Sequence, residues 1–260
     1  MFSAFYSSSF FSALPEQKAL KIDVAFVPEE VHPSEITDKS VLIVDILRAT
    51  STITTAIANG ASYLIPVDIP KEAFELYEQL DRNAILGGEV GGKRIEGFDL
   101  GNSASEYLPS IVEGKPIIMR TTNGTRTINV CKSALNLVIG SFLNKTSCCR
   151  YLLGLGCDIL IVCSGEEGHF GIEDAVFAGA CVHILHQQVS NIKKTDSALA
   201  CEMMYQQCKS DILDLLRKSE HGKYLVDIGL GYDLILCAKE DITTVVPVYR
   251  DGKIIKAKGV

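Results

Sequence analysis

Four segments that follow apolar runs carry side chains able to bind an anion or a metal ion. The first covers residues 45–52 and places Asp45 and Arg48 next to the hydroxyl groups of Thr50 and Ser51. A guanidinium, hydroxyls and the N–H groups at a helix start can together hold a phosphate or a carboxylate. The alternative is that Thr50 or Ser51 only caps a helix while Asp45 pairs with Arg48.

The second segment, residues 87–103, is rich in glycine, which suits a tightly bent backbone or the close approach of a ligand. It carries the polar side chains Glu89, Lys93, Asp99 and Asn102. It contains neither a GK[ST] phosphate loop nor a GxGxxG loop, so neither nucleotide-binding class is supported. The alternative is a plain glycine-rich surface loop.

The third segment reads Thr-Thr-Asn-Gly-Thr-Arg over residues 121–126 and resembles the first in layout. Its candidate anion-binding groups are those of Thr122, Asn123, Gly124, Thr125 and Arg126. Hydroxyls, a glycine and an arginine at a helix start again favour an anion site. A helix cap at Thr122 or Asn123 is the alternative.

The fourth segment, residues 164–174, ends with Glu173 and Asp174 in the first turn of an expected helix. Carboxylates there are favoured by the helix dipole alone. The other interpretation is that one of them turns inward as a ligand for Mg²⁺. Further along, His183 and His186 are three residues apart, and we interpret them as packed helix residues rather than metal ligands.

Familiar hydrolase motifs are absent from the sequence. No cysteine has an arginine six residues later, and no DxDx[TV] loop, G-x-S-x-G elbow, HExxH helix or paired CxxC metal site occurs. Any hydrolytic activity must therefore use a different arrangement of residues.

The elements that must position these segments alternate between strands and helices. Expected strands cover residues 22–27, 41–46, 63–67, 84–86, 116–120, 135–139, 158–163 and 243–249, and a hairpin joins 248–250 to 253–255. Expected helices cover residues 51–59, 70–80, 144–153, 172–187, 197–209, 211–217 and 221–228. Most strands are continuous apolar runs, which indicates that both faces of the sheet are covered.

This pattern predicts a three-layer α/β/α fold with a central, largely parallel or mixed sheet. The sequence leaves open whether this fold is built from two related halves that meet near residue 130. Ligands of such sheets bind beyond the carboxyl ends of the strands, so the four segments are expected to converge there.

Composition narrows the function classes. The 260 residues carry a net charge of −7, which argues against a nucleic-acid partner, and no apolar run is long enough to span a membrane. The nine cysteines are scattered, as in proteins of a reducing cytoplasm. We expect residues 1–20 to be a flexible extension and residues 21–260 to form one domain. The sequence leaves open whether the chain forms a homo-oligomer.

Several blocks of the chain resemble the 2-phosphosulfolactate phosphatases of coenzyme M biosynthesis. The blocks are residues 44–60, 93–103, 121–126, 140–144 and 245–249, in order along nearly the whole chain. The resemblance implies an α/β phosphatase distinct in fold from other phosphatases. It also implies a Mg²⁺-dependent phosphoric monoester hydrolase that converts (2R)-2-phospho-3-sulfolactate to (2R)-3-sulfolactate and phosphate.

Under this resemblance we assign hypothetical roles to the candidate residues. The metal ligands would be drawn from Asp45, Asp99, Glu89 and Asp174. Arg48 and Arg126 would neutralise the phosphoryl oxygens, and the neutral donors would be Thr50, Ser51, Thr122, Asn123, Gly124 and Thr125. Lys93 and Asn102 would hold the carboxylate or sulfonate end of this small anionic substrate. Attack by water is favoured over a covalent aspartyl-phosphate at Asp45.

Two positions depart from the family pattern. Val90 stands where an arginine is expected, and Glu166 stands where an arginine or a neutral residue is expected. Both changes would weaken binding of a substrate with three anionic groups. A phosphatase for another 2-phospho-hydroxyacid or a phosphosugar therefore remains an alternative, as does a non-hydrolytic anion-binding domain.

Overall fold

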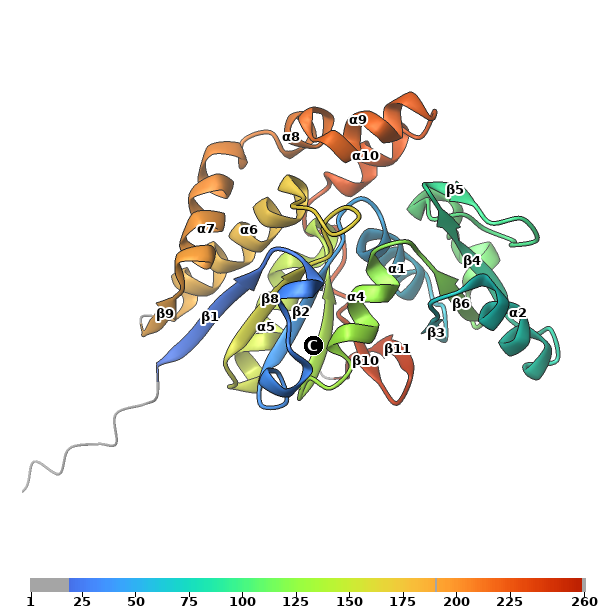
Figure 1. Cartoon of the computed structure of the whole chain (residues 1–260), viewed down its shortest axis with the longest axis horizontal. Coiled ribbons are helices and arrows are strands. Elements are labelled where there is room, and N and C mark those ends of the chain that lie inside the picture. Colours follow the sequence, from blue (N-terminus) through green and yellow to red (C-terminus); the bar gives the residue numbers. More distant parts are fainter. Residues whose placement is uncertain (1–18, 190, 259–260) are drawn as a thin grey trace, which may run out of the picture.

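Eleven strands form one mixed sheet in the computed structural model, which describes residues 19–189 and 191–258 (Figure 1). In spatial order the strands are β5 (Lys93–Arg94), β4 (Ile85–Val90), β6 (Pro116–Arg120), β3 (Tyr63–Pro66), β11 (Lys253–Lys256), β10 (Pro247–Arg250), β7 (Asn136–Gly140), β2 (Ser40–Val44), β8 (Ile159–Cys163), β1 (Leu20–Ala25) and β9 (Ile192–Lys194). The predicted α/β class is confirmed.

The sheet consists of two parallel groups joined by an antiparallel hairpin. Strands β4, β6 and β3 pair in parallel, and so do β7, β2, β8, β1 and β9. The hairpin β10–β11 lies between the groups, with β11 antiparallel to β3 and β10 antiparallel to β7. The groups do not divide the chain near residue 130, because β1 and β2 belong with β7.

Helices cover both faces of the sheet. They are α1 (Ala49–Ala58), α2 (Pro70–Gln79), α3 (Pro109–Val112), α4 (Gly124–Cys131), α5 (Lys145–Leu155), α6 (Ile172–Gln188), α7 (Asp196–Cys208), α8 (Ile212–Lys218), α9 (Glu220–Asp227) and α10 (Tyr232–Cys237). Helices α5, α6 and α7 pack on one face, and α1 and α4 pack on the other.

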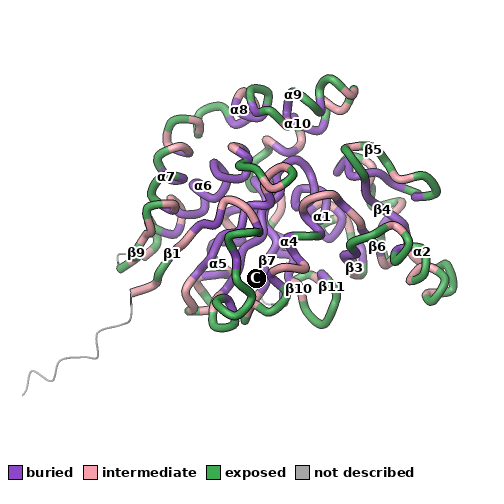
Figure 2. Tube along the Cα trace, viewed as in Figure 1, coloured by how far each residue is buried: buried purple, intermediate pink, exposed green. Residues whose placement is uncertain are grey.

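Strand β2 shows why the apolar runs are continuous. Its five residues are all buried. Leu42 and Val44 point into the core that contains α6, whereas Val41 and Ile43 point into the core that contains α1 and α4. Successive side chains of a strand face opposite sides, so a strand covered on both sides must be apolar throughout. Figure 2 shows the buried residues concentrated in this sheet and in α1 and α6.

Several elements differ from the sequence-based expectation. The short elements β5, β9, α3 and α10 were not expected, because two to six residues give too little periodicity to detect. The last expected strand begins at Pro247 rather than at residue 243. The sheet already begins at Leu20, and the rest of the expected extension, residues 1–18, lies outside the described residues.

Two further observations concern the cysteines and the possible membrane-spanning segments. All nine cysteines are free thiols in the structure. Within residues 19–189 and 191–258, none of the helices is long and apolar enough to cross a membrane.

Candidate active site

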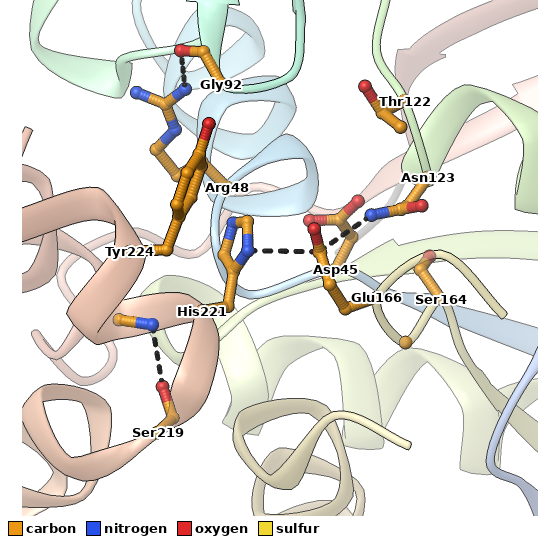
Figure 3. A network of polar contacts seen from close by, with 12 residues as sticks. Asp45, Arg48, Gly92, Thr122, Asn123, Ser164, Glu166, Ser219, His221 and Tyr224 are labelled. Atoms are coloured by element: carbon orange, nitrogen blue, oxygen red, sulfur yellow. Dashed lines mark hydrogen bonds and ion pairs between the residues drawn. The ribbon is translucent and has the colours of Figure 1, made fainter. Parts of the chain in front are cut away.

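A pocket of about 630 Å³ opens where the carboxyl ends of β2, β4, β6 and β8 meet helix α9. Its polar lining includes Asp45, Arg48, Glu89, Asn102, Thr122, Asn123, Glu166, Glu173, His221 and Tyr224. Figure 3 shows residues of this lining approaching one another, among them Asp45 after β2, Glu166 in the β8–α6 loop and His221 on α9. The pocket therefore lies at the sheet edge where α/β proteins bind ligands.

Asp45 follows β2 directly and begins the turn into α1. Its Oδ1 accepts a hydrogen bond from the N–H of Ala49 at 3.0 Å, which fixes the carboxylate at the start of the helix. The pKa of Asp45 is raised to about 7, chiefly by burial; the hydrogen bond from Ala49 and the charge of His221 lower it, and the charges of Glu89 and Glu166 raise it. Asp45 is therefore the pocket carboxyl group poised between its two protonation states near neutral pH.

The start of α4 must come very close to Asp45, and Gly124 makes this possible. A Cβ atom on Gly124 would lie 2.9 Å from Asp45 Oδ2 and 2.5 Å from the Cβ of Ala49. Any other residue would push α4 away from α1. The glycine in the third polar segment is thus a packing requirement between two helix starts.

Arg48 is buried and held by two protein acceptors. Its Nη1 is 2.7 Å from Asp233 Oδ2 on α10, and its Nη2 donates to the carbonyl of Gly92 at 2.8 Å (Figure 3). Ser103 donates to the other oxygen of Asp233. Because a guanidinium has five N–H donors, Arg48 retains donors for an anion while its orientation is fixed.

Glu89 ties the end of β4 to the loop after β6. Its Oε1 accepts from the N–H of Thr122 at 2.7 Å, and its Oε2 accepts from the N–H of Gly92 at 2.7 Å and the hydroxyl of Thr122 at 3.1 Å. Glu89 therefore holds the β4–β5 turn and the loop after β6 together as one pocket wall.

Glu166 connects the third and fourth segments. Its Oε2 accepts from Asn123 Nδ2 at 3.0 Å and lies 3.0 Å from His221 Nδ1. Glu173, in the first turn of α6, lines the same wall, and burial raises the pKa of its carboxyl group. Three loops and α9 are therefore linked by charged groups on this side of the pocket.

The lining contains more carboxylates than cations. Its carboxyl groups are those of Asp45, Glu89, Glu166, Glu167, Glu173 and Glu220, whereas its positive or protonatable side chains are Arg48, His169 and His221. Such a pocket repels an anion unless a further positive charge is present. Its excess of hard oxygen atoms is the donor set that Mg²⁺ prefers.

The described residues contain no group of three or more His, Cys, Asp or Glu side chains that could hold a metal ion. Mg²⁺ commonly uses one or two carboxylates and completes its shell with water and substrate oxygens. The buried Oδ1 of Asn102, which lines the pocket, has no hydrogen-bond partner in the described part of the chain. That acceptor fits a cation or a ligand hydroxyl.

Six of the residues selected from sequence meet in this pocket. They are Asp45, Arg48, Glu89, Asn102, Thr122 and Asn123. Three charged residues selected from the sequence, Lys93, Asp99 and Arg126, do not line this pocket.

Each of the three has a physical reason for its position. Lys93 is an exposed residue of the two-residue strand β5. Asp99 Oδ2 accepts from the N–H of Leu86, near the start of β4 rather than at its carboxyl end. Arg126 pairs with Glu29 at 2.6 Å on the outer side of α4.

The remaining selected residues bond to the backbone of the loops and turns that carry the pocket residues. Asp174 accepts from the backbone N–H groups of Ile46, Ser164 and Gly165, so its oxygens join the β2 and β8 loops instead of facing the pocket. The hydroxyls of Thr50, Ser51 and Thr125 donate to backbone carbonyls within their own turns. These three hydroxyls therefore bond to the local backbone instead of facing the pocket, and neither α1 nor α4 begins with a side-chain cap.

Sequence reasoning missed His221, Tyr224 and Asp233. They lie on short helices about 50 to 190 residues away from the pocket loops in the chain, and no strand precedes them. The only local signal was Ser219 before Glu220, a helix-start pattern that says nothing about a pocket.

Fold and pocket together define an α/β protein with a polar pocket at the carboxyl edge of its sheet. A family model described as 2-phosphosulpholactate phosphatase matches residues 25–252. The chain therefore belongs to the 2-phosphosulfolactate phosphatase family, whose members are phosphoric monoester hydrolases.

Relatives in other organisms match over nearly the whole chain. A probable 2-phosphosulfolactate phosphatase of Clostridium acetobutylicum is 36% identical over 236 residues, covering 91% of this chain and all of the relative. One from Carboxydothermus hydrogenoformans is 40% identical over 229 residues, covering 88% of this chain and 92% of the relative. One from Clostridium botulinum strain Eklund 17B is 37% identical over 238 residues, covering 91% of this chain and all of the relative.

Proposed function

We propose that this phosphatase hydrolyses (2R)-2-phospho-3-sulfolactate to (2R)-3-sulfolactate and phosphate, the type of step used in coenzyme M biosynthesis, with Mg²⁺ as cofactor. The observation that carries the proposal is the pocket at the sheet edge, where Asp45 and Arg48 stand together on the turn after β2. The names of the matching family and relatives support the substrate. The nine free cysteines support a reducing, cytoplasmic location.

The pocket residues fit a Mg²⁺ ion through oxygen donors. Asp45 and the unpaired Oδ1 of Asn102 would hold it, together with water and the substrate. Bound there, Mg²⁺ would supply positive charge for the phosphoryl oxygens and lower the pKa of a bound water. This charge also offsets the excess of carboxylates in the lining.

The chain's own residues orient and shield the substrate. Arg48, fixed by Asp233, would donate to phosphoryl oxygens, whose charge is spread in the transition state. Thr122 and Asn123, placed by Glu89 and Glu166, would line the opposite wall. Tyr224, whose hydroxyl donates to the carbonyl of Gly91 at 2.9 Å, joins α9 to the β4–β5 turn and limits the entry of bulk water.

Phosphate release from purified protein tests the proposal. We expect release from 2-phosphosulfolactate in Mg²⁺ and a loss of at least about tenfold when EDTA removes the metal. The panel should include 2-phospholactate and a phosphosugar, because Glu166 and Glu173 make the pocket wall negative. Faster release from either compound would replace the substrate in this proposal, and full activity in EDTA would remove Mg²⁺ from it.

The route of attack can be tested in the same preparation. Direct attack by water leaves no phosphate on the protein. Labelled phosphate retained after acid quenching, and lost in Asp45→Asn, would instead show a covalent aspartyl-phosphate at Asp45.

A further inference from the structure

His221 is a histidine of the pocket wall whose Nδ1 forms an ion pair with a carboxylate without the geometry of a directed hydrogen bond. It lies in the first turn of α9. Ser219 caps the start of this helix, because its hydroxyl accepts a hydrogen bond from the N–H of Gly222 at 3.0 Å (Figure 3). The side chain is 11% exposed, and its Nδ1 lies 3.0 Å from Glu166 Oε2. Because Nδ1 faces Glu166, Nε2 is the nitrogen left for a ligand.

We propose that His221 is the general acid of the reaction and protonates the substrate oxygen that leaves phosphorus. This inference rests on the proposed function, because it concerns hydrolysis of a phosphate ester in the same pocket. Asp45, Arg48 and His221 all line that pocket, so one substrate can reach both the phosphate-binding side and the imidazole.

The proton balance of the step is simple. The oxygen of a water molecule forms a bond to phosphorus, and the bond from phosphorus to the substrate's 2-oxygen breaks with its electron pair on that oxygen. The proton on His221 Nε2 moves to the 2-oxygen and gives the alcohol. Both hydrogens of the water stay with the phosphate, which leaves as H₂PO₄⁻, and solvent reprotonates His221.

The surroundings of His221 keep a proton available. The charged groups that face it are Glu166 from the β8–α6 loop, Glu173 from α6 and Asp45 from the β2–α1 turn. Burial lowers the pKa of the imidazole, but these carboxylates outweigh burial, Glu166 most of all, and hold the pKa above its ordinary value. Within α9 itself, Glu220 adds a negative neighbour, and the uncharged ring of Tyr224 lies 6.0 Å away, centroid to centroid.

His169 is the other histidine of the pocket lining, but its environment differs. It is exposed, and among the described contacts no carboxylate pairs with its ring. An imidazole without a partner is not held in one orientation toward a substrate. The geometry therefore favours His221.

A leaving-group comparison tests the proposal on the full chain with Mg²⁺. The probes are 2-phosphosulfolactate and 2-phospholactate, whose leaving alkoxides need a proton, and p-nitrophenyl phosphate, whose phenolate leaves without one. For His221→Asn we expect kcat/KM to fall by about 100-fold or more on the alkyl esters and by less than about tenfold on the aryl ester. Equal losses on both kinds of ester, or no loss, would overturn the proposal.

The control is His186→Asn. His186 is half exposed on α6 and pairs with Glu202, away from the pocket, so all three activities should match wild type. Circular dichroism shows whether each variant is folded. If wild type cleaves 2-phospholactate and the aryl ester but not 2-phosphosulfolactate, the proposed substrate fails while the test of His221 still stands. If wild type cleaves none of the three, both proposals fail.

The second measurement uses pH and the milder variant Glu166→Gln, which keeps an oxygen acceptor for Asn123. Wild-type kcat/KM on the alkyl ester should decline on the alkaline side as His221 loses its proton. Removing the charge of Glu166 should move this decline to lower pH, and His221→Asn should abolish it. An unchanged alkaline limb in Glu166→Gln would show that His221 does not donate the proton.

Discussion

Among the individual residues, Asp45 shows that burying a carboxylate in a pocket lowers the stability of the folded protein. Its pKa rises to about 7 in the folded protein, chiefly because burial disfavours the charged form. A carboxyl group with a raised pKa stabilises the fold least above that pKa, where it is ionised in both states. The loss begins near the unfolded value of 3.8 and is complete above about pH 7.

Asp45→Asn should therefore stabilise the protein while abolishing turnover. Asparagine keeps an oxygen for the N–H of Ala49 and carries no charge. We expect a gain in the free energy of unfolding at pH 8, with roughly 4 kcal/mol as its upper bound, that shrinks as the pH falls to 5. Denaturant unfolding at the two pH values measures it, and phosphate release should fall by about 100-fold or more.

Asp99→Asn is the matched control for this prediction. Asp99 lies outside the pocket, so its replacement should leave kcat within about twofold of wild type. It should also cost about 1 kcal/mol at both pH values, because the hydrogen bond from Leu86 is disturbed. If Asp45→Asn is destabilising at pH 8, the burial of its charge does not oppose folding.

At the scale of elements, the sequence predicts which residues follow a strand better than it predicts which way the side chains of a helix point. The apolar runs identify β2, β4 and β6, and the residues after them, such as Asp45 and Thr122, do line the pocket. Arg126 fails because successive helix residues turn by about 100°. Gly124 faces Asp45, so Arg126, two residues on, points to the other side of α4 and meets Glu29.

Helix α10 illustrates the part of the site that no local sequence pattern predicts. Its contribution is Asp233, which accepts from Arg48 across 185 residues of chain. The segment around it is short and apolar and resembles any surface helix that packs on a core. Only the packing of α8, α9 and α10 over the sheet edge places this carboxylate beside the guanidinium (Figure 1).

Asp233→Ala tests this role, because it removes the contact of α10 with Arg48. Arg48 and Asp233 are 3% and 5% exposed, so the change leaves a buried guanidinium without its main partner. We expect a loss of about 3–5 kcal/mol in the free energy of unfolding and a raised KM. Asp227→Ala, an exposed aspartate of neighbouring α9, should change stability by less than about 0.5 kcal/mol. Similar results for the two variants would show that α10 does not hold Arg48.

Viewed as a whole molecule, the pocket straddles two groups of parallel strands. Glu89 and Thr122 come from the group of β4, β6 and β3, whereas Asp45 and Glu166 follow β2 and β8 in the other group. The sheet between the groups is continuous only through the hairpin β10–β11. Activity should therefore depend on this hairpin, although the hairpin does not line the pocket.

Ile254→Ala tests this dependence. Ile254 is fully buried in β11 and lies opposite Leu64 of β3 in the core shared with α1 and α4. Its truncation should cost about 2–4 kcal/mol, and Ile254→Val should cost only about 1 kcal/mol. Because the hairpin couples the two groups, we expect far-ultraviolet circular dichroism and loss of phosphatase activity to follow one denaturant transition in both variants. If activity is lost before the helical signal, the groups unfold separately and the hairpin does not make the sheet one cooperative unit.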